Sequence, residues 1–128
     1  MIEHTQRKFS LIRRMRSLTC ALRGIRMMVR SQHNAWIHAG MTGIVISAGI
    51  IAGLTTSGWC WITLAIVSVW TAEAFNTALE FLTDLISPDY HPLAMRVKDI
   101  SAGAVLITAL GACIIGVLVF GPYLADIF

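Results

Sequence analysis

Four polar side chains near the middle of the chain have types and a spacing that suit chemistry. They are Glu73, Asn76, Glu80 and Asp84, in the stretch AEAFNTALEFLTD. An α-helix turns by about 100° per residue, so all four would project within a sector of about 80°. Three of the seven acids of the chain lie within residues 73–84. We therefore expect one helical face to carry a row of carboxylates beside an amide.

These acids adjoin a very apolar part of the chain. Residues 31–72 contain no Asp, Glu, Lys or Arg, and neither do residues 100–125. The chain of 128 residues is 56% hydrophobic and 13% charged, whereas soluble proteins carry about 25% charged residues. Because a membrane-spanning helix needs roughly 20 apolar residues, the first stretch can hold two spans and the second one. We predict an all-α integral membrane protein with a single domain over residues 1–128.

Break signals divide the apolar stretches into three spans. Ser57-Gly58 is a turn signal inside the longer stretch. Pro88 disfavours a helix at the residue before it, and Pro92 discourages an early restart. The last span should stop near Gly121-Pro122, and the GxxxG at residues 49–53 indicates close packing between helices. We expect the spans at about 36–54, 59–86 and 97–121.

The region before the first span has apolar residues at helical spacing, with most arginines outside their sector. This predicts an amphipathic helix over about residues 5–30 that lies in the membrane surface. The simpler alternative is a basic tail that only sets the orientation. Eight of the ten Lys and Arg residues lie in the first thirty residues, and the other two follow the second span. Positive-inside bias then places the N-terminus and the loop at 87–98 in the cytoplasm.

The depth of the acids in the membrane suggests their roles. At about 1.5 Å per residue, Glu73 lies roughly 21 Å from Trp59 and Glu80 roughly 31 Å, in a hydrocarbon core about 30 Å thick. An acid inside the core costs about 2.5–3.5 kcal/mol, which makes Glu73 a candidate for function. A carboxylate shielded from water suits a general base. Glu80, nearer water, suits a divalent cation, since Mg²⁺ often binds carboxylates together with substrate phosphates.

With basic residues expected on the same side, these acids indicate a phosphoryl-transfer site, where catalysis is mostly positioning and charge neutralisation. The chain contains neither G-x-x-x-x-G-K-[ST] nor G-x-G-x-x-G, so it has no familiar nucleotide-binding loop. One alternative is a proton or ion pathway, which also uses intramembrane acids. A pathway should leave ionisable groups in the outer half of the membrane, and this sequence has none there. The other alternative is that the acids only pair with basic residues and hold helices together.

EAFNTALEFLTD and the following SPDYHPLAMRVKDISAGAVL resemble the signature of the prokaryotic diacylglycerol kinase family. ALRGIRMMVRSQHNAWIH is similar to the stretch that leads into its first span, and the resemblance covers about residues 12–110. It implies an ATP- and Mg²⁺-dependent lipid kinase of the bacterial cytoplasmic (inner) membrane, with no nucleic-acid partner. It also implies a homotrimeric helical bundle with active sites at the subunit boundaries. The acceptor would be diacylglycerol, giving phosphatidic acid, or alternatively undecaprenol.

The resemblance also implies a role for each matched residue. Glu73 would be the base that takes the proton of the lipid hydroxyl, and Asn76 would orient it. Glu80 would bind the metal and ATP. The other positions implied to contact ATP are Arg13, Asp89, Tyr90, His91, Lys98 and Asp99. The role of Asp84 is left open.

The chain departs from the family at Gln32, where members often carry an acid that is a second metal ligand. Gln32 offers a neutral carbonyl oxygen, so the implied metal site of Glu80 and Gln32 would be weaker. A further alternative is therefore a degenerate membrane protein that holds nucleotide or lipid without chemistry. We interpret His4, His33 and His38 as interfacial polar residues and not as ligands.

Overall fold

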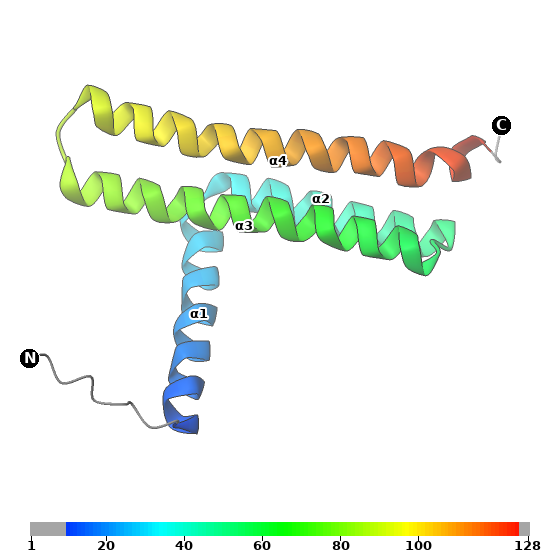
Figure 1. Ribbon diagram of the computed structural model, residues 1–128, viewed down its shortest axis with the longest axis horizontal. Coiled ribbons are helices and arrows are strands. Elements are labelled where there is room, and N and C mark those ends of the chain that lie inside the picture. Colours follow the sequence, from blue (N-terminus) through cyan, green and yellow to red (C-terminus); the bar gives the residue numbers. More distant parts are fainter. Residues whose placement is uncertain (1–9, 126–128) are drawn as a thin grey trace, which may run out of the picture.

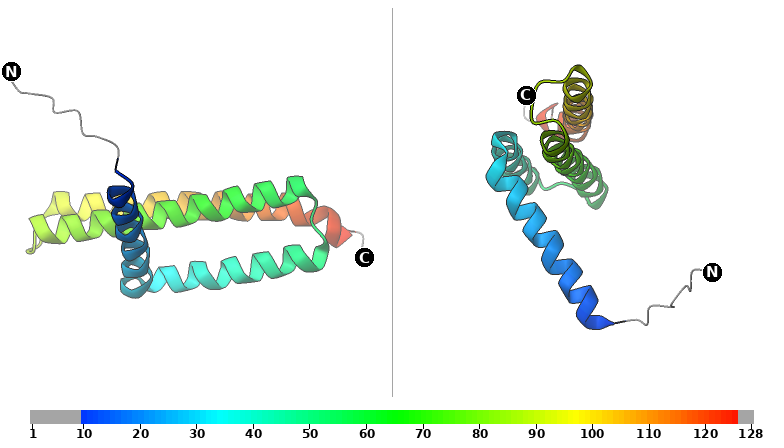
Figure 2. Two further views of the ribbon diagram at one scale, coloured as in Figure 1. Left: turned by 90° about the horizontal axis from the view of Figure 1, so that it is seen from below. Right: turned by 90° about the vertical axis from the view of Figure 1, so that its left-hand side faces the viewer.

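The computed structural model describes residues 10–125, which form four α-helices and no strand. The helices are α1 (Leu11–Ser31), α2 (His33–Ala52), α3 (Thr56–Ile86) and α4 (Pro92–Ala125). α2, α3 and α4 run alongside one another as a bundle, and α1 runs across them from the start of α2 (Figure 1). Two further views show the same arrangement, with the α2–α3 turn and the end of α4 at one end of the bundle (Figure 2).

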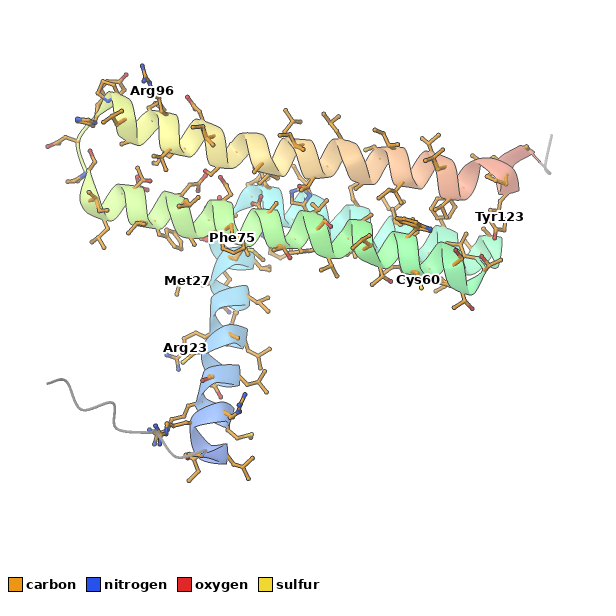
Figure 3. The ribbon with its side chains drawn as sticks, in the orientation of Figure 1. Arg23, Met27, Cys60, Phe75, Arg96 and Tyr123 are labelled. Carbon is orange, nitrogen blue, oxygen red and sulfur yellow. The ribbon has the colours of Figure 1, made fainter. Side chains whose placement is uncertain are left out.

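The two ends of the bundle differ in character. Arg96 lies at the end where α3 and α4 are joined, and Tyr123 lies at the opposite end, near the start of α3 (Figure 3). The Tyr123 hydroxyl accepts a hydrogen bond from the backbone N–H of Thr55 at 3.4 Å. Phe75 lies where α1 meets the bundle (Figure 3). The last part of α3 and the start of α4 therefore extend past the junction of α1 and α2 (Figure 1).

The predicted all-helical class is confirmed for the described residues, and three of the helices are candidate membrane spans. α2, α3 and α4 are each long and apolar enough to cross a membrane. Their outer faces carry many exposed apolar side chains, such as Ile51 at 87% and Leu85 at 80%. Such faces suit a lipid environment, where apolar side chains need no cover from water. His4 and residues 5–9 of the expected surface helix lie outside the described residues.

The turn between α2 and α3 is made by Gly53, and the expectation that Ser57-Gly58 makes it was wrong. Gly53 has a φ of 64°, in the left-handed region that favours glycine. The N–H of Leu54 then donates to the carbonyl of Gly49 at 3.1 Å, which closes the end of α2. α3 starts at once because the Oγ1 of Thr55 accepts from the N–H of residue 58 at 3.3 Å.

The two glycines of the GxxxG segment have different tasks. Gly49 is buried, and a Cβ built on it would lie 2.9 Å from Cη2 of Trp59 in α3. The close packing predicted for the motif is thus confirmed at Gly49. A Cβ on Gly53 would meet no atom within 4 Å, so this glycine is needed for the backbone conformation alone.

α4 is longer at both ends than the predicted 97–121. Pro92 is its first residue, a position where the missing N–H would have no helical partner and the fixed φ suits a helix. His91 caps this end, since its Nδ1 accepts from the N–H of Leu93 at 3.2 Å. The helix also continues through Pro122 to Ala125, because a proline so close to the end removes few helical hydrogen bonds. The expectations that Pro92 delays the helix and that Pro122 ends it were wrong.

Replacing Gly53 by alanine should destabilise the fold by about 1–2 kcal/mol, because an L-residue is strained in the left-handed region. Thermal unfolding of the purified protein in detergent would measure this. Gly24→Ala is the matched control, since Gly24 lies within α1 and its new Cβ would have open space. The control should be unchanged or more stable by up to about 1 kcal/mol. Equal unfolding temperatures for Gly53→Ala and the unsubstituted protein would contradict the role of Gly53.

Candidate active site

The buried face of α3 changes from apolar to polar along its length. Ile62, Ala65 and Val69 are buried in the first half, and Glu73 and Asn76 are buried after them. Glu73 has no exposed surface at all, and Asn76 is 4% exposed. The stripe predicted from the sequence therefore begins inside the bundle, with its first two members facing the other helices.

The carboxylate of Glu73 is buried without a hydrogen-bond partner among the described residues. The Nε2 of His38 in α2 lies 3.7 Å from its Oε2, which is longer than a hydrogen bond. Buried charges in proteins are normally paired and hydrogen-bonded, and a buried polar group without a partner calls for an explanation. An acid of this kind inside a membrane span is a candidate for catalysis.

Hydrogen bonds join the next polar residues into one network. The Nδ2 of Asn76 donates to Oε1 of Glu80 at 3.2 Å, and the Nε2 of Gln32 donates to Oε2 of Glu80 at 2.7 Å. The hydroxyl of Ser101 in α4 donates to Oδ1 of Asn76 at 2.7 Å. The network thus links α3 to α4 and to the junction of α1 and α2. It brings together Gln32, Asn76 and Glu80, all three of which were predicted as site residues from the sequence.

Ser101 is the member of this network that sequence reasoning missed. It is 6% exposed, and its hydroxyl also lies 2.9 Å from the carbonyl oxygen of Lys98. A signal for it existed, because Ser101 follows Lys98 by three residues and so lies on the same side of a helix. A serine hydroxyl is not expected to react here. Without it, however, the buried Oδ1 of Asn76 would have no hydrogen-bond donor.

Asp84, whose role the sequence left open, pairs with Lys98. The Nζ of Lys98 lies 2.5 Å from Oδ1 of Asp84, and the two side chains are 36% and 62% exposed. Exposed pairs of this kind contribute about 0–1 kcal/mol to stability. The main consequence of the pair is therefore to hold the ammonium group of Lys98 beside α3.

Asp89, Tyr90, His91 and Asp99 lie outside the network in the described part of the chain. No hydrogen bond or ion pair among residues 10–125 connects it to Asp89, Tyr90, His91 or Asp99. Tyr90 is 78% exposed in the loop after α3, and His91 uses its Nδ1 to cap α4. Arg13 lies in the first turn of α1, which points away from the bundle (Figure 1).

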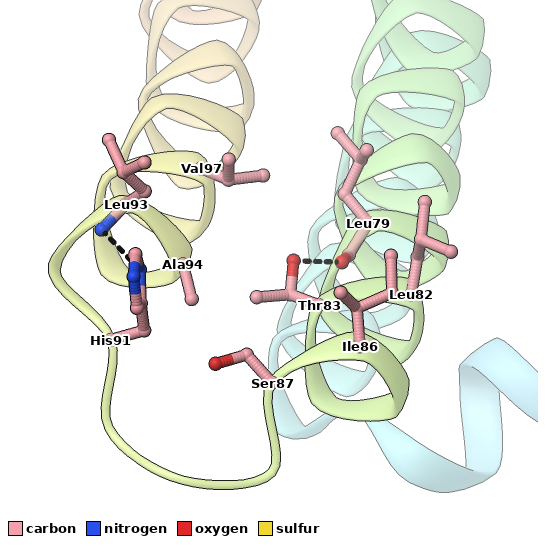
Figure 4. Close-up of a pocket in the computed structure, with 9 residues that line it drawn as sticks. All are labelled: Leu79, Leu82, Thr83, Ile86, Ser87, His91, Leu93, Ala94 and Val97. Carbon is pink, nitrogen blue, oxygen red and sulfur yellow. Dashed lines mark hydrogen bonds between the residues drawn. The ribbon is translucent and has the colours of Figure 1, made fainter.

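A pocket of about 400 Å³ lies between the joined ends of α3 and α4 (Figure 4). Its walls are mostly apolar, with Leu79 and Val97 on opposite sides. The polar groups of Thr83 and His91 are engaged in local hydrogen bonds, shown as dashed lines in Figure 4. None of the acids lines this pocket. It is therefore separate from the network around Glu80.

An apolar cavity, also of about 400 Å³, lies between α2, α3 and α4. His38, Thr42 and Trp70 line one part of it, and small residues of α4 such as Ala112 and Gly116 line another. Ligand cavities are typically apolar with a few polar groups. In this cavity the polar groups come from α2, which carries His38 and Thr42, and from α3, which carries Trp70 and also Glu73.

The donor set around Glu80 fits a divalent cation in part. Mg²⁺ takes oxygen ligands and often uses one or two carboxylates together with substrate phosphates and water. Glu80 supplies a carboxylate, and the amide of Gln32 would supply an oxygen after a flip that exchanges its O and N. No cluster of three His, Cys, Asp or Glu side chains that could hold a metal occurs in the described part of the chain. A cation at Glu80 would therefore take its other ligands from water or a bound phosphate.

Ser101→Ala should lower the free energy of unfolding by about 1–3 kcal/mol, because it leaves the buried amide oxygen of Asn76 without a donor. Chemical or thermal unfolding in detergent would measure the change. Asp84→Asn is the control, since it breaks an exposed pair and should cost no more than about 1 kcal/mol. A Ser101→Ala protein as stable as the unsubstituted one would show that the amide does not depend on this hydroxyl.

Comparison with known proteins agrees with the resemblance seen in the sequence. Residues 19–120 match the family model described as prokaryotic diacylglycerol kinase. The undecaprenol kinase of Bacillus subtilis is 40% identical over 109 residues, which cover 85% of this chain and 89% of that protein. The diacylglycerol kinase of Synechocystis sp. is 37% identical over 102 residues, which cover 78% of this chain and 58% of that protein. This chain therefore belongs to the prokaryotic diacylglycerol kinase family and is a lipid kinase.

Proposed function

We propose that this protein transfers the γ-phosphoryl group of ATP to the hydroxyl of a membrane lipid, with Glu73 as the general base. The observation that carries the proposal is the fully buried carboxylate of Glu73, which has no hydrogen-bond partner among the described residues. A base for a lipid alcohol must lie below the membrane surface yet keep a free acceptor oxygen. In support, Glu73 lies in a helix that could span a membrane, and neither of its carboxylate oxygens has a hydrogen-bond partner among the described residues.

In the proposed reaction, the lipid hydroxyl gives its proton to Glu73 while its oxygen forms a bond to the γ-phosphorus. The bond from that phosphorus to the bridging oxygen breaks, and ADP leaves. Phosphoryl transfer of this kind depends on positioning and on neutralising the phosphate charge. Lys98, held by Asp84, would contribute positive charge to the phosphates, and Asn76 would orient the reacting groups.

Mg²⁺ is part of the proposal. Glu80 and Gln32 would hold it, and when bound it would neutralise charge on the phosphates. The 2.7 Å contact between the two side chains supports their placement in one site. Asp99 and the loop residues Asp89, Tyr90 and His91 are proposed to contact the nucleotide on the family resemblance alone.

The relative depth of Glu73 and Glu80 supports this division of roles. Seven residues of helix separate them, which corresponds to roughly 10 Å along the axis. Glu73 has no exposed surface, while Glu80 is only partly buried. A lipid hydroxyl lies near the headgroups and ATP arrives from water, so the base should be deeper than the residue that meets the phosphates.

We further propose that the chain lies in the bacterial inner membrane with its N-terminus in the cytoplasm and with α1 on the membrane surface. The charge distribution supports the orientation, since eight of the ten Lys and Arg residues lie in the first thirty residues. The apolar side of α1 supports the surface position. Leu11, Leu18 and Leu22 are 71%, 57% and 58% exposed, as expected of a face that enters the acyl boundary.

The protein is proposed to be a homotrimer with its active sites at the subunit boundaries, on the basis of the family resemblance. The position of Arg13 is consistent with this proposal. The first turn of α1 points away from the bundle of its own chain, so Arg13 would reach the site of a neighbouring subunit (Figure 1). Chemical cross-linking in membranes, followed by mass measurement, would test the number of subunits.

Diacylglycerol is the proposed acceptor and undecaprenol is the alternative. The relatives support both, because one is named for each lipid. Purified protein should be incubated with radiolabelled ATP, Mg²⁺ and either diacylglycerol, undecaprenol or no added lipid. Labelled phosphatidic acid supports the first acceptor, and labelled undecaprenyl phosphate supports the second. No labelled lipid with either acceptor would overturn the proposed function in favour of a degenerate binding protein.

Glu73→Gln should lower turnover by about 10²–10⁴-fold, the contribution typical of general acid–base catalysis. The amide keeps the size of the side chain but cannot accept the proton. Expression and oligomeric mass should stay unchanged, and both are to be measured beside the phosphorylation rate. Loss of the assembly with Glu73→Gln would instead favour a purely structural role for this acid.

Gln32→Glu should lower the Mg²⁺ concentration needed for half-maximal activity, because a second carboxylate next to Glu80 attracts the cation more strongly. Without the cation the two carboxylates repel each other, so this variant should gain thermal stability on addition of Mg²⁺. Gln32→Ala is the matched control and should need more Mg²⁺ than the unsubstituted protein. An unchanged Mg²⁺ requirement in both variants would remove Gln32 from the metal site.

A further inference from the structure

The carboxylate of Glu73 faces a basic side chain that has no role in the proposed reaction. The Nε2 of His38 in α2 lies 3.7 Å from Oε2 of Glu73. The His38 side chain is 16% exposed and that of Glu73 is fully buried, so the two groups meet where little water reaches. The separation exceeds a hydrogen bond, but catalytic hydrogen bonds are often long until the substrate binds. The interpretation of His38 as an interfacial polar residue does not describe this contact.

The ring of His38 is itself held by α3. It meets Trp70 edge to face, with 6.5 Å between the ring centroids and 62° between the ring planes. The Nε1 of Trp70 in turn donates to Oγ1 of Thr42 at 3.1 Å. Thr42 follows His38 by one turn of α2, and Trp70 precedes Glu73 by about one turn of α3. The four residues therefore form one cluster between α2 and α3, in which the ring of His38 lies between Trp70 and Glu73.

The polar network around Glu80 does not reach the carboxylate of Glu73. The hydrogen bonds from Gln32, Asn76 and Ser101 end on Glu80, on Asn76 or on the backbone. The hydroxyl of Thr77 bonds only to the backbone oxygen of Glu73. A general base that must meet a substrate hydroxyl needs a fixed direction for its acceptor oxygen, since misplacement lowers the rate steeply. His38 is placed to supply it.

We propose that His38 is a positioning residue whose Nε2–H donates to Oε2 of Glu73 and thereby leaves Oε1 free to face the lipid hydroxyl. This inference rests on the proposed role of Glu73 as the base. In this proposal the proton is on Nε2, because only a protonated ring nitrogen can donate to a carboxylate oxygen. Trp70, which donates to Thr42, lies against the ring of His38, and all three residues line the apolar cavity.

Two substitutions at His38 separate positioning from simple packing. His38→Phe keeps a ring against Trp70 but removes the N–H donor, and His38→Gln keeps an N–H donor at similar reach but removes the ring. If His38 positions Glu73, the phenylalanine lowers kcat by about tenfold or more. The KM values for ATP and lipid should change by less than about twofold, since ground-state binding is untouched. The glutamine should restore most of the lost kcat.

His33→Phe is the matched control, because His33 lies on the same helix but is exposed. Its kcat should equal that of the unsubstituted protein. In a Glu73→Gln background, His38→Phe should not slow the residual reaction further, because His38 acts through Glu73. A fully active His38→Phe protein would overturn the inference. Equal loss of kcat in His38→Phe and His38→Gln, together with a lower unfolding temperature, would also overturn it and assign His38 to packing.

A spectroscopic test on the whole protein does not depend on activity. The ¹⁵N resonance of the His38 Nε2 should shift when Glu73 is replaced by glutamine, while the His33 resonances stay in place. No shift at His38 would overturn the inference. The activities of the two variants distinguish a failure of this inference from a failure of the proposed function. An inactive Glu73→Gln protein together with a fully active His38→Phe protein rejects only the positioning role of His38. A fully active Glu73→Gln rejects Glu73 as the base, and with it the role of His38.

Discussion

A carboxylate inside a membrane span is the constraint on which the rest of the arrangement depends. Burial removes the water that would stabilise its charge, and neighbouring groups must compensate. Glu73 is fully buried, yet the described residues give it no hydrogen bond and only the nearby imidazole of His38. A helix made only for stability would replace such an acid by an apolar residue, as it does at Val69 one turn earlier.

Three polar residues of α3 each meet a different partner from outside this helix. Glu73 faces α2, Glu80 meets the α1–α2 junction through Gln32, and Asn76 meets α4 through Ser101. The order along the axis also runs from buried to exposed, ending at Asp84 on the surface. The same helix therefore buries one acid completely and leaves another partly exposed.

The prolines and glycines of the sequence correctly indicated that helix ends and turns lie nearby, but they did not give the residues at which each helix begins or ends. Prolines break helices in their interior, yet Pro92 opens α4 and Pro122 lies near its end, where a missing N–H matters little. Glycines mark turns, yet Gly53 makes the turn while the segment at Ser57 is the first turn of α3. In each case the hydrogen bonds of the neighbouring residues decide, and the sequence alone does not display them.

The sequence by itself determined the membrane class, the three spans, the family and the row of acids on one face of α3. The family follows from the resemblance of sequence motifs. The other features follow from long apolar stretches and from helical periodicity, both of which are local. Only the tertiary structure decided which acid has partners and which has none, because that depends on residues far away in the chain. Ser101 reaches Asn76 from 25 residues away, and Gln32 reaches Glu80 from 48 residues away. His38 faces Glu73 for the same reason: helix packing, and not spacing in the chain, brings the two side chains together.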